Sequence, residues 1–346
     1  TGKRRPALLL PNDDDLTYAK VRLDPVSLAT VRASLGRITD PMARALCWTA
    51  LWNAARDGES PATLYVEAVA AFGPAETQIG VLLNILDNAV TAIERYTHVP
   101  ARDALRSSFL AAVAGELDLS VPGSDHQLAW ARALGTLSRQ DPALLPRLRG
   151  LLDGTARVDG LAIDAELRWH FWHALAAHGQ ATLAELDAEL ARDTTASGRA
   201  GHATAAAARP DPAVKDAAWQ EAVHGTGLSN QLLTATISGF TTAPGELLGP
   251  YVEPYFGCLR DVWEQRSIEI ASRIVRGLFP LDQDLGPGME PAGHPVLRRT
   301  DAWLEANPDA PRALRRIVVE QRDHLLRALK AQAAVVNSST AGAPAH

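Results

Sequence analysis

"ITDPMARALCWTALWNAARDGE", residues 38–59, decides the fold class because it contains the beginning, the body and the end of a helix. Asp40 is a typical N-cap residue, and Pro41 follows at the first helical position, where the absent N–H has no intrahelical partner to lose. The apolar residues after it recur with the helical period, and Gly58 lies where the helix should stop. The stretch therefore predicts a helix over residues 41–57.

The same start and stop signals recur along the chain. A capping side chain precedes proline at Asp24-Pro25, Ser60-Pro61, Asp141-Pro142 and Asp211-Pro212, and stop signals lie at Gly36, Gly73, Gly154 and Gly179. Further helices are predicted near residues 25–35, 61–72, 74–97, 100–117, 124–139, 142–152, 162–177, 181–192, 196–208, 212–223, 229–239, 251–264, 266–278, 294–306 and 310–333. Because the connections are short, successive helices should be antiparallel neighbours. We predict an all-α fold, an α-solenoid of antiparallel helix pairs of the HEAT or armadillo type, although the sequence contains no evident repeat.

The N-terminal stretch "LLLPNDDDLTYAKVRLD", residues 8–24, is the one convincing strand signal. Residues 16–23 alternate between two faces, residues 7–10 form an opposing run, and residues 11–15 have turn composition. An isolated hairpin is marginal in water, so its sheet is expected to lie outside this chain. We predict a residual β-hairpin at 1–24, a helical superhelical domain at 25–333 and a disordered tail at 334–346.

Composition narrows the possible partners and compartment. The chain has 346 residues, of which 47% are hydrophobic and 21% charged, and a net charge of -6. A folded, soluble protein is indicated, and neither nucleic acid nor an anionic membrane is an expected partner. No run reaches the roughly 18 apolar residues of a membrane helix. Cys47 and Cys258 suit buried thiols in a reducing compartment, so a cytoplasmic location is expected.

An acidic run near the N-terminus resembles part of a calcium loop. Asp13, Asp15, Thr17 and Asp24 fall at loop positions 1, 3, 5 and 12, but Tyr18 occupies the position where the sharp turn needs glycine. We therefore interpret the run as a solvated turn.

Three residues of "ELRWHFWH" share one helical face. Glu166, His170 and His173 are spaced i, i+4 and i+7, so they could reach a single metal ion. The neighbouring aromatic residues favour a packed helix pair instead, because histidines inside helices are commonly partly buried structural residues. We expect no metal ligands in this chain.

The remaining motifs point to no catalytic or cofactor-binding residue. A Gly-x-Ser-x-Gly elbow is absent, Cys47 lies in an apolar run that disfavours a thiolate, and "GTG" at Gly225–Gly227 lacks a third glycine and a preceding strand. The C-terminal helix is basic, but acidic residues on it partly neutralise the positive charge. This favours a solvent-exposed helix face over a nucleic-acid-binding surface. The charged residues of this helix are Arg312, Arg315, Arg316, Glu320, Arg322, Asp323, Arg327 and Lys330.

Five stretches together resemble one family. They are residues 8–24, residues 38–59, "ELARDTTASGRAGHATAAAARPDP", "AWQEAVHGTGLSNQLLTATISGF" and "YVEPYFGCLRDVWEQRSIEIASRIVRGLFP". These stretches resemble the C-terminal region of the actinobacterial aminopeptidase N enzymes, a family of gluzincin zinc aminopeptidases that remove N-terminal residues from peptides. The resemblance covers nearly all residues from 7 to 330 and implies that residues 7–24 end a β-sandwich and that a HEAT-like domain follows.

The resemblance carries no catalytic residue onto this chain. The family's His-Glu-x-x-His zinc motif is absent, and "PGMEP" at Pro287–Pro291 departs at both ends from the Gly-x-Met-Glu-Asn motif that holds the substrate amine. The resemblance implies a domain that encloses the active-site chamber and helps to select peptides. Its partners would be the catalytic and β-sandwich domains of a parent enzyme, which would hold the zinc, so this segment should be inactive alone. The alternative is an independent α-solenoid scaffold that binds a protein partner in a concave groove.

Overall fold

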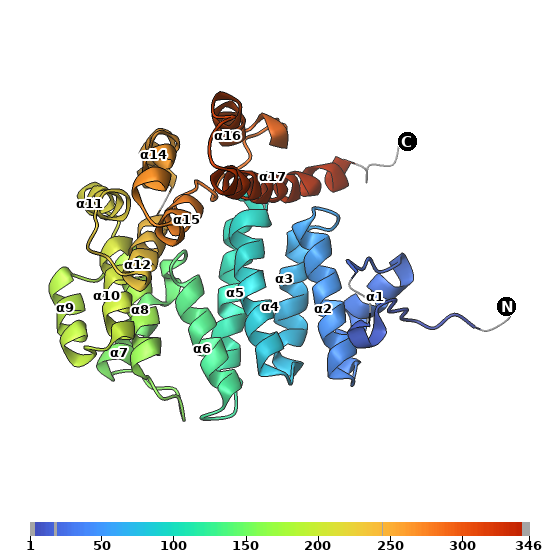
Figure 1. Ribbon diagram of the computed structural model, residues 1–346. Coiled ribbons are helices and arrows are strands. Elements are labelled where there is room, and N and C mark those ends of the chain that lie inside the picture. Colours follow the sequence, from blue (N-terminus) through green and yellow to red (C-terminus); the bar gives the residue numbers. More distant parts are fainter. Residues whose placement is uncertain (1–3, 17–18, 244, 341–346) are drawn as a thin grey trace. The chain divides into compact units, whose positions relative to one another are not determined.

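The computed structural model describes the backbone of residues 4–16, 19–243 and 245–340 and the side chains up to residue 334 (Figure 1). These residues form helices joined by short irregular segments, and none of them is in a β-strand. The α-helices are α1 (Pro25–Ser34), α2 (Pro41–Arg56), α3 (Ala62–Phe72), α4 (Ile79–Thr91), α5 (Val99–Leu119), α6 (Asp125–Leu137), α7 (Leu145–Asp153), α8 (Ala165–Ala177), α9 (Leu183–Arg192), α10 (Ala196–Ala208), α11 (Pro212–Val223), α12 (Asn230–Thr241), α13 (Gly245–Leu248), α14 (Val252–Gln265), α15 (Ile268–Gly277), α16 (Pro295–Ala306) and α17 (Arg312–Thr340).

Short helical turns complete the described backbone. The 3-10 turns are η1 (Asp13–Asp15), η2 (Leu35–Arg37), η3 (Gly73–Ala75), η5 (Pro142–Leu144), η6 (Gly249–Tyr251) and η7 (Pro291–Gly293), and η4 (Ala92–Tyr96) is a π-helical turn that continues α4. The chain forms two compact units. One comprises residues 1–133 and 327–346, the other residues 134–326, and the chain passes between them within α6 and within α17.

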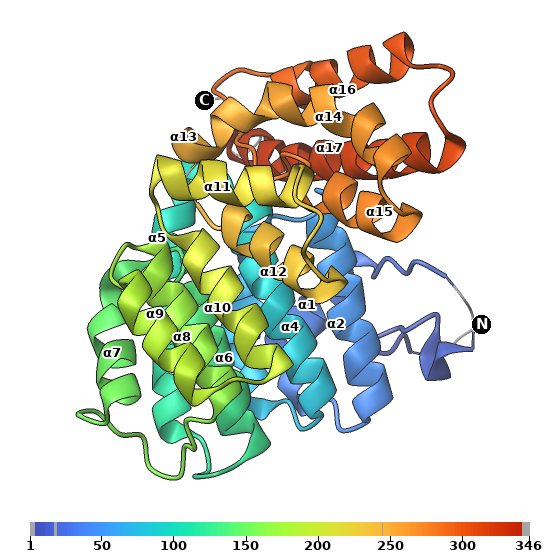
Figure 2. The same cartoon turned by 60° about the vertical axis from the view of Figure 1, so that its left-hand side comes forward.

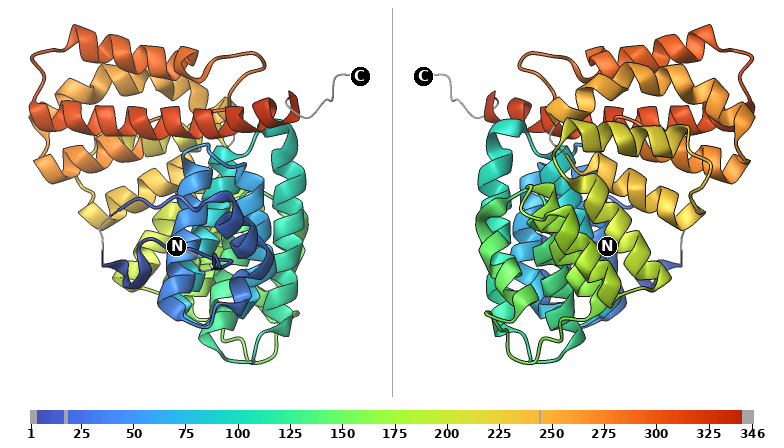
Figure 3. Two further views of the ribbon diagram at one scale, coloured as in Figure 1. Left: turned by 90° about the vertical axis from the view of Figure 1, so that its right-hand side faces the viewer. Right: turned by 90° about the vertical axis from the view of Figure 1, so that its left-hand side faces the viewer.

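In the first unit, α2, α3, α4 and α5 lie side by side (Figures 1 and 3). Their facing sides are apolar: Leu82 and Ile85 of α4 are at most 1% exposed. Trp48 of α2 and Tyr65 of α3 meet edge to face, with ring centroids 6.2 Å apart. This aromatic and aliphatic burial supplies the main force that holds the unit together.

In the second unit, α8, α10 and α12 lie side by side (Figure 2), and α7, α9 and α11 each pack against the helix that follows them in the chain. Successive helices thus form antiparallel pairs. This arrangement confirms the predicted all-α fold, an α-solenoid of antiparallel helix pairs. α14 packs against both α15 and α16. Within the described part of the chain, no helix combines the length and apolarity needed to span a bilayer.

Most of the predicted helix signals are confirmed. The carboxylates of Asp24, Asp40 and Asp211 each accept from backbone N–H groups at the start of α1, α2 and α11, and Asp141 does so at η5. Ser60 was wrongly expected to cap a helix: α3 begins at Ala62, with the extended Pro61 at the N-cap position and no side-chain cap.

The predicted helix at 74–97 begins later than expected, at Ile79. The reason is Glu76, whose side chain is buried and accepts from Nε and Nη2 of Arg44 at 2.9 and 2.7 Å. Trp48 Nε1 donates to the same carboxylate at 3.2 Å. Residue 76 has an extended backbone, and a buried ion pair therefore overrides the local helix preference here.

The predicted hairpin is wrong for the described residues of this chain. Backbone groups of residues 7–9 bond to α1 and not to a strand: Leu9 N donates to Ser27 Oγ at 2.9 Å, and Thr30 Oγ1 donates to Ala7 O at 2.8 Å. Residues 13–15 form the 3-10 turn η1, and residues 17–18 lie outside the described part. Without a third strand or a packed partner, the alternating pattern does not produce a paired sheet.

The C-terminal boundary also differs from the expected one. The backbone of α17 continues to Thr340, so residues 334–340, predicted as part of a disordered tail, are helical. The rest of that predicted tail, residues 341–346, lies outside the described residues.

Candidate functional site

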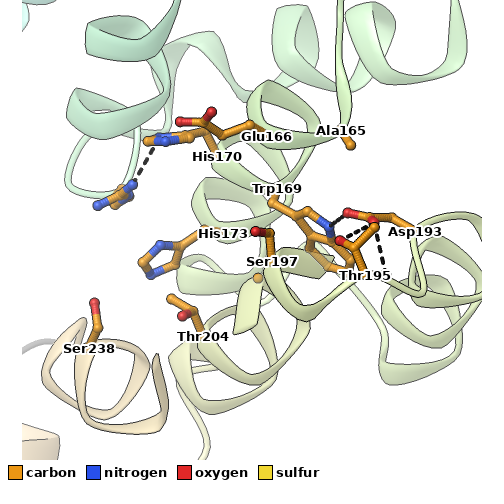
Figure 4. Close-up of a pocket in the computed structure, with 12 residues that line it drawn as sticks. Ala165, Glu166, Trp169, His170, His173, Asp193, Thr195, Ser197, Thr204 and Ser238 are labelled. Carbon is orange, nitrogen blue, oxygen red and sulfur yellow. Dashed lines mark hydrogen bonds between the residues drawn. The ribbon is translucent and has the colours of Figure 1, made fainter. Parts of the chain in front are cut away.

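A cavity of about 450 Å³ opens within the second unit, among α8, α10, α12 and the turn that follows α6 (Figure 4). Its walls carry three of the residues that the sequence singled out, Glu166, His170 and His173. Volumes of this order are typical of small-molecule and peptide side-chain sites. This cavity is therefore the candidate functional site.

Small residues of α10 create the wall opposite α8. A Cβ atom at Gly201 would collide with the ring of Trp169, so only glycine lets the two helices approach this closely. The indole in turn is fixed, because Trp169 Nε1 donates to Asp193 Oδ2 at 3.0 Å. Thr195 Oγ1 also donates to Asp193 Oδ1, at 2.6 Å. Both hydrogen bonds lower the pKa of Asp193, and the bond from Thr195 contributes more than the bond from Trp169. The charged carboxylate thus anchors the α9–α10 connection.

His173 is the most buried titratable group of the cavity wall, with 4% of its surface exposed. In Figure 4 its ring lies between His170 on one side and Thr204 and Ser238 on the other. Its Nε2 is 3.1 Å from Thr242 Oγ1. Burial first, and then the charges of neighbouring cationic side chains, hold the pKa of His173 well below its usual value, so the imidazole is neutral near pH 7.

Lys215 lies behind this wall and is fully buried. Its ammonium group donates to three backbone carbonyls, those of Ala207 (2.7 Å), Gly239 (3.0 Å) and Thr242 (3.2 Å). These carbonyls belong to the C-terminal ends of α10 and α12, where helices leave acceptors unsatisfied. Burial lowers the pKa of Lys215 to about 7. The lysine fastens the two helix ends together.

Arg139 and His170 meet at another edge of the cavity. Arg139 Nη2 lies 3.3 Å from His170 Nδ1, which makes that nitrogen the acceptor. Glu166, one turn earlier on α8, is exposed at the rim. Cationic and anionic side chains therefore both reach this cavity.

The predicted sharing of one face by Glu166, His170 and His173 is confirmed by their common cavity. The same three residues do not form a metal site. In the part of the chain that the structure describes, no three His, Cys, Asp or Glu side chains come together as a group that could hold a metal ion. Each histidine interacts with another protein group: His170 with the guanidinium of Arg139, and His173 with Thr242.

The other sequence candidates have structural roles. Of the acidic run, residues 13–15 form the turn η1, Asp24 caps α1, and Thr17 lies outside the described residues. Burial raises the pKa of both Cys47 and Cys258 to about 11, which keeps them as thiols. Gly225–Gly227 is a loop after α11.

Residues of the basic helix α17 bond to nearby protein groups. Arg322 pairs with Asp301, Arg327 Nη1 lies 3.0 Å from Asp57 Oδ1, and Arg315 donates to the carbonyls of Leu304 and Asn307. Each of these three arginines therefore has a protein partner, and the solvated face stays a prediction.

Sequence reasoning did not identify Arg139, Asp193 or Lys215. Asp193 could have been found, because it precedes the capping Thr195 within one of the family-like stretches. Lys215 gives no such signal: it is a single lysine in an alanine-rich helix, where an exposed position is the usual expectation.

Comparison with known proteins agrees with the resemblance noted in the sequence. The family model described as the ERAP1-like C-terminal domain matches residues 8–327. Aminopeptidase N of Streptomyces lividans is 46% identical over 335 residues, which make up 96% of this chain and 38% of that protein. The matched region is thus a minor part of the relative's length but nearly all of this chain. The resemblance to the C-terminal region of aminopeptidase N is confirmed, and the chain belongs to the ERAP1-like C-terminal domain family.

Proposed function

We propose that this chain is the helical domain that encloses the active-site chamber of a zinc-dependent aminopeptidase and helps to select peptides, while other domains supply the chemistry. The observation that carries the proposal is that 96% of the chain aligns with 38% of an aminopeptidase N. The His-Glu-x-x-His motif is absent from the 346 residues, so a catalytic zinc would have to be held elsewhere.

The residues present do not fit a catalytic zinc site. Glu166, His170 and His173 are the best candidates, yet the two histidines face Arg139 and Thr242. We therefore expect the chain alone to carry no stoichiometric zinc and to leave aminoacyl reporter substrates intact. Elemental analysis that found one tightly held zinc per chain would contradict this expectation.

The proposed partners are the catalytic and β-sandwich domains of the parent enzyme, with peptides as substrates. The first described residues support attachment to a preceding domain, since Leu9 and Leu16 leave 44% and 86% of their surfaces exposed. A β-sandwich packed there would cover them. A cytoplasmic location is part of the same proposal, and the free thiols of Cys47 and Cys258 suit a reducing compartment.

The test is a truncation of a parent aminopeptidase that removes the region corresponding to residues 25–346. The zinc site should remain chemically intact but open, and turnover of long peptides should fall more than that of a single-residue reporter, because remote binding contacts help to position the scissile bond. The measurement is the ratio of kcat/KM for the two substrates in the full enzyme and the truncation, with folded protein quantified in each. An unchanged ratio would contradict the chamber role and favour the scaffold.

A further inference from the structure

The hydrogen bonds of Thr242 determine which nitrogen of His173 carries the proton. Thr242 Oγ1 is 2.9 Å from the carbonyl oxygen of Ser238, to which only its hydroxyl hydrogen can be donated. The same oxygen must therefore accept from His173 Nε2, 3.1 Å away. Because the imidazole is neutral, its other nitrogen, Nδ1, carries a lone pair and no proton.

That lone pair has no hydrogen-bonding partner among the described residues, although His173 is only 4% exposed and lines the cavity. Nδ1 is not among the fully buried side-chain atoms that lack a partner, so its lone pair is open to the cavity. A group that enters the cavity and donates a hydrogen bond would therefore find an acceptor at Nδ1.

The cavity wall carries charges of both signs, so a charged ligand of either sign meets repulsion as well as attraction. Arg139 would repel an ammonium group. A carboxylate would meet the His173 lone pair and the negative charges of Glu166 and Asp193. An uncharged group that both donates and accepts hydrogen bonds is repelled by neither set of charges. The hydroxyl groups of Ser197 and Ser238 also line the wall.

We propose that this cavity is a subsite for an uncharged peptide side chain that carries a hydrogen-bond donor, of which the carboxamide of glutamine is the type, and that His173 Nδ1 accepts from it. The inference rests on the proposed function for the identity of the ligand as a peptide. The volume of about 450 Å³ accommodates one such side chain with part of its flanking backbone.

The first test compares three small probes on this chain: N-acetyl-glutaminamide, the corresponding glutamate derivative with its side-chain carboxylate, and N-acetyl-methioninamide. Binding is followed at neutral pH by the side-chain nitrogen resonances of His173. The glutamine probe should bind about tenfold tighter than either of the others, because only it offers a donor without a charge. Tightest binding of the glutamate probe would overturn the proposal in favour of an anion site at Arg139. Equal affinities, or no measurable binding, would overturn it as well.

The second test changes the group that fixes the tautomer. Thr242→Val keeps the shape of the side chain but removes the oxygen that accepts from His173 Nε2. The preference for glutamine over glutamate should then fall to less than about threefold, since Nδ1 can carry the proton and act as a donor. Thr241→Val is the matched control, because its hydroxyl bonds only to the helix carbonyls of Ile237 and Ser238. Equal effects of the two substitutions would overturn the role of His173.

This experiment and the truncation can fail independently. The probes need no catalytic domain, and their outcome depends on the cavity of this chain. The ratio of peptide and reporter turnover depends on the parent enzyme. An unchanged turnover ratio together with a glutamine preference would reject the chamber role and leave the binding site.

Discussion

Arg168 and Glu189 form a two-point ion pair inside the second unit, with Nε and Nη2 of Arg168 each 2.6 Å from a carboxylate oxygen of Glu189. Trp172 Nε1 donates to the same carboxylate at 3.1 Å. Burial acts to raise the pKa of Glu189, but the bonds from Arg168 and Trp172 outweigh it, and the pKa is lowered. The pair links α8 to α9 and holds the helix that carries His173.

Glu189→Gln should therefore destabilise the protein strongly. The Glu189 side chain is 4% exposed, and removing its charge leaves the guanidinium of Arg168 buried without compensation. We expect a loss of about 3 kcal/mol in the free energy of unfolding, measured by urea denaturation. Glu185→Gln is the control, because its pair with Arg149 is 39% and 32% exposed and should cost less than about 1 kcal/mol. Similar losses for the two variants would argue that the buried pair has no special role.

Gly201→Ala tests how closely α8 and α10 must approach. The added Cβ would collide with the indole of Trp169, which cannot turn away without giving up its bond to Asp193. We expect a loss of about 2–3 kcal/mol from overpacking. Gly257→Ala in α14 is the control: no atom lies within 4 Å of its added Cβ, so the variant should be up to about 1 kcal/mol more stable. Thermal unfolding distinguishes these opposite signs, and a neutral Gly201→Ala would contradict the packing argument.

The sequence predicts the helices well because their signals are local. A capping aspartate followed by proline, as at Asp40 and Pro41, fixes the start of a helix within a few residues. Glu76 shows the limit of such signals: its pairing with Arg44, 32 positions away in the chain, decides where α4 can begin. A long-range ion pair leaves no periodic trace in the sequence.

The candidate site was predicted only in part, for a related reason. Helical spacing alone places Glu166, His170 and His173 on one face. The neutral state of His173 comes first from burial among other elements, and its tautomer comes from the bond to Thr242. Both properties depend on tertiary packing, so the sequence could suggest a metal site but could not reveal a neutral, tautomer-fixed imidazole.

Asp57 tests how the N-terminal segment is held on the first unit. Its carboxylate pairs with Lys20 and Arg22 of that segment and with Arg327 of α17. Asp57→Asn should increase hydrogen exchange at residues 19–24 while costing only about 1 kcal/mol of global stability, since the partners are partly exposed. Asp103→Asn removes the 91% exposed partner of Arg106 and should leave that segment unchanged. Unaltered exchange at 19–24 in the Asp57 variant would show that other contacts hold the segment.

The stability of the protein should fall in mildly acidic solution because of His173. Its pKa in the folded state is well below the value of about 6.5 expected for the unfolded chain, so the unfolded state binds more protons below that pH. The contribution of neutral His173 to the free energy of unfolding is therefore complete above about pH 7.5 and is lost as the pH falls below 6.5. Positive charge on Arg139, on His170 when it is protonated, and on Lys215 lowers the pKa of His173 in the same direction as burial does.

The measurement is the free energy of unfolding at several pH values for the wild type and His173→Gln. Between about pH 7.5 and 5.5 the wild type should lose roughly 1 kcal/mol more than the variant. Burial also lowers the pKa of His294. Because both proteins contain His294, the comparison between them removes its contribution. Carboxylates such as Glu189, whose pKa is lowered, titrate at more acidic pH and are likewise common to both. Identical pH profiles would mean that His173 is protonated as readily in the folded protein as in the unfolded chain, which would contradict the lowered pKa of this group.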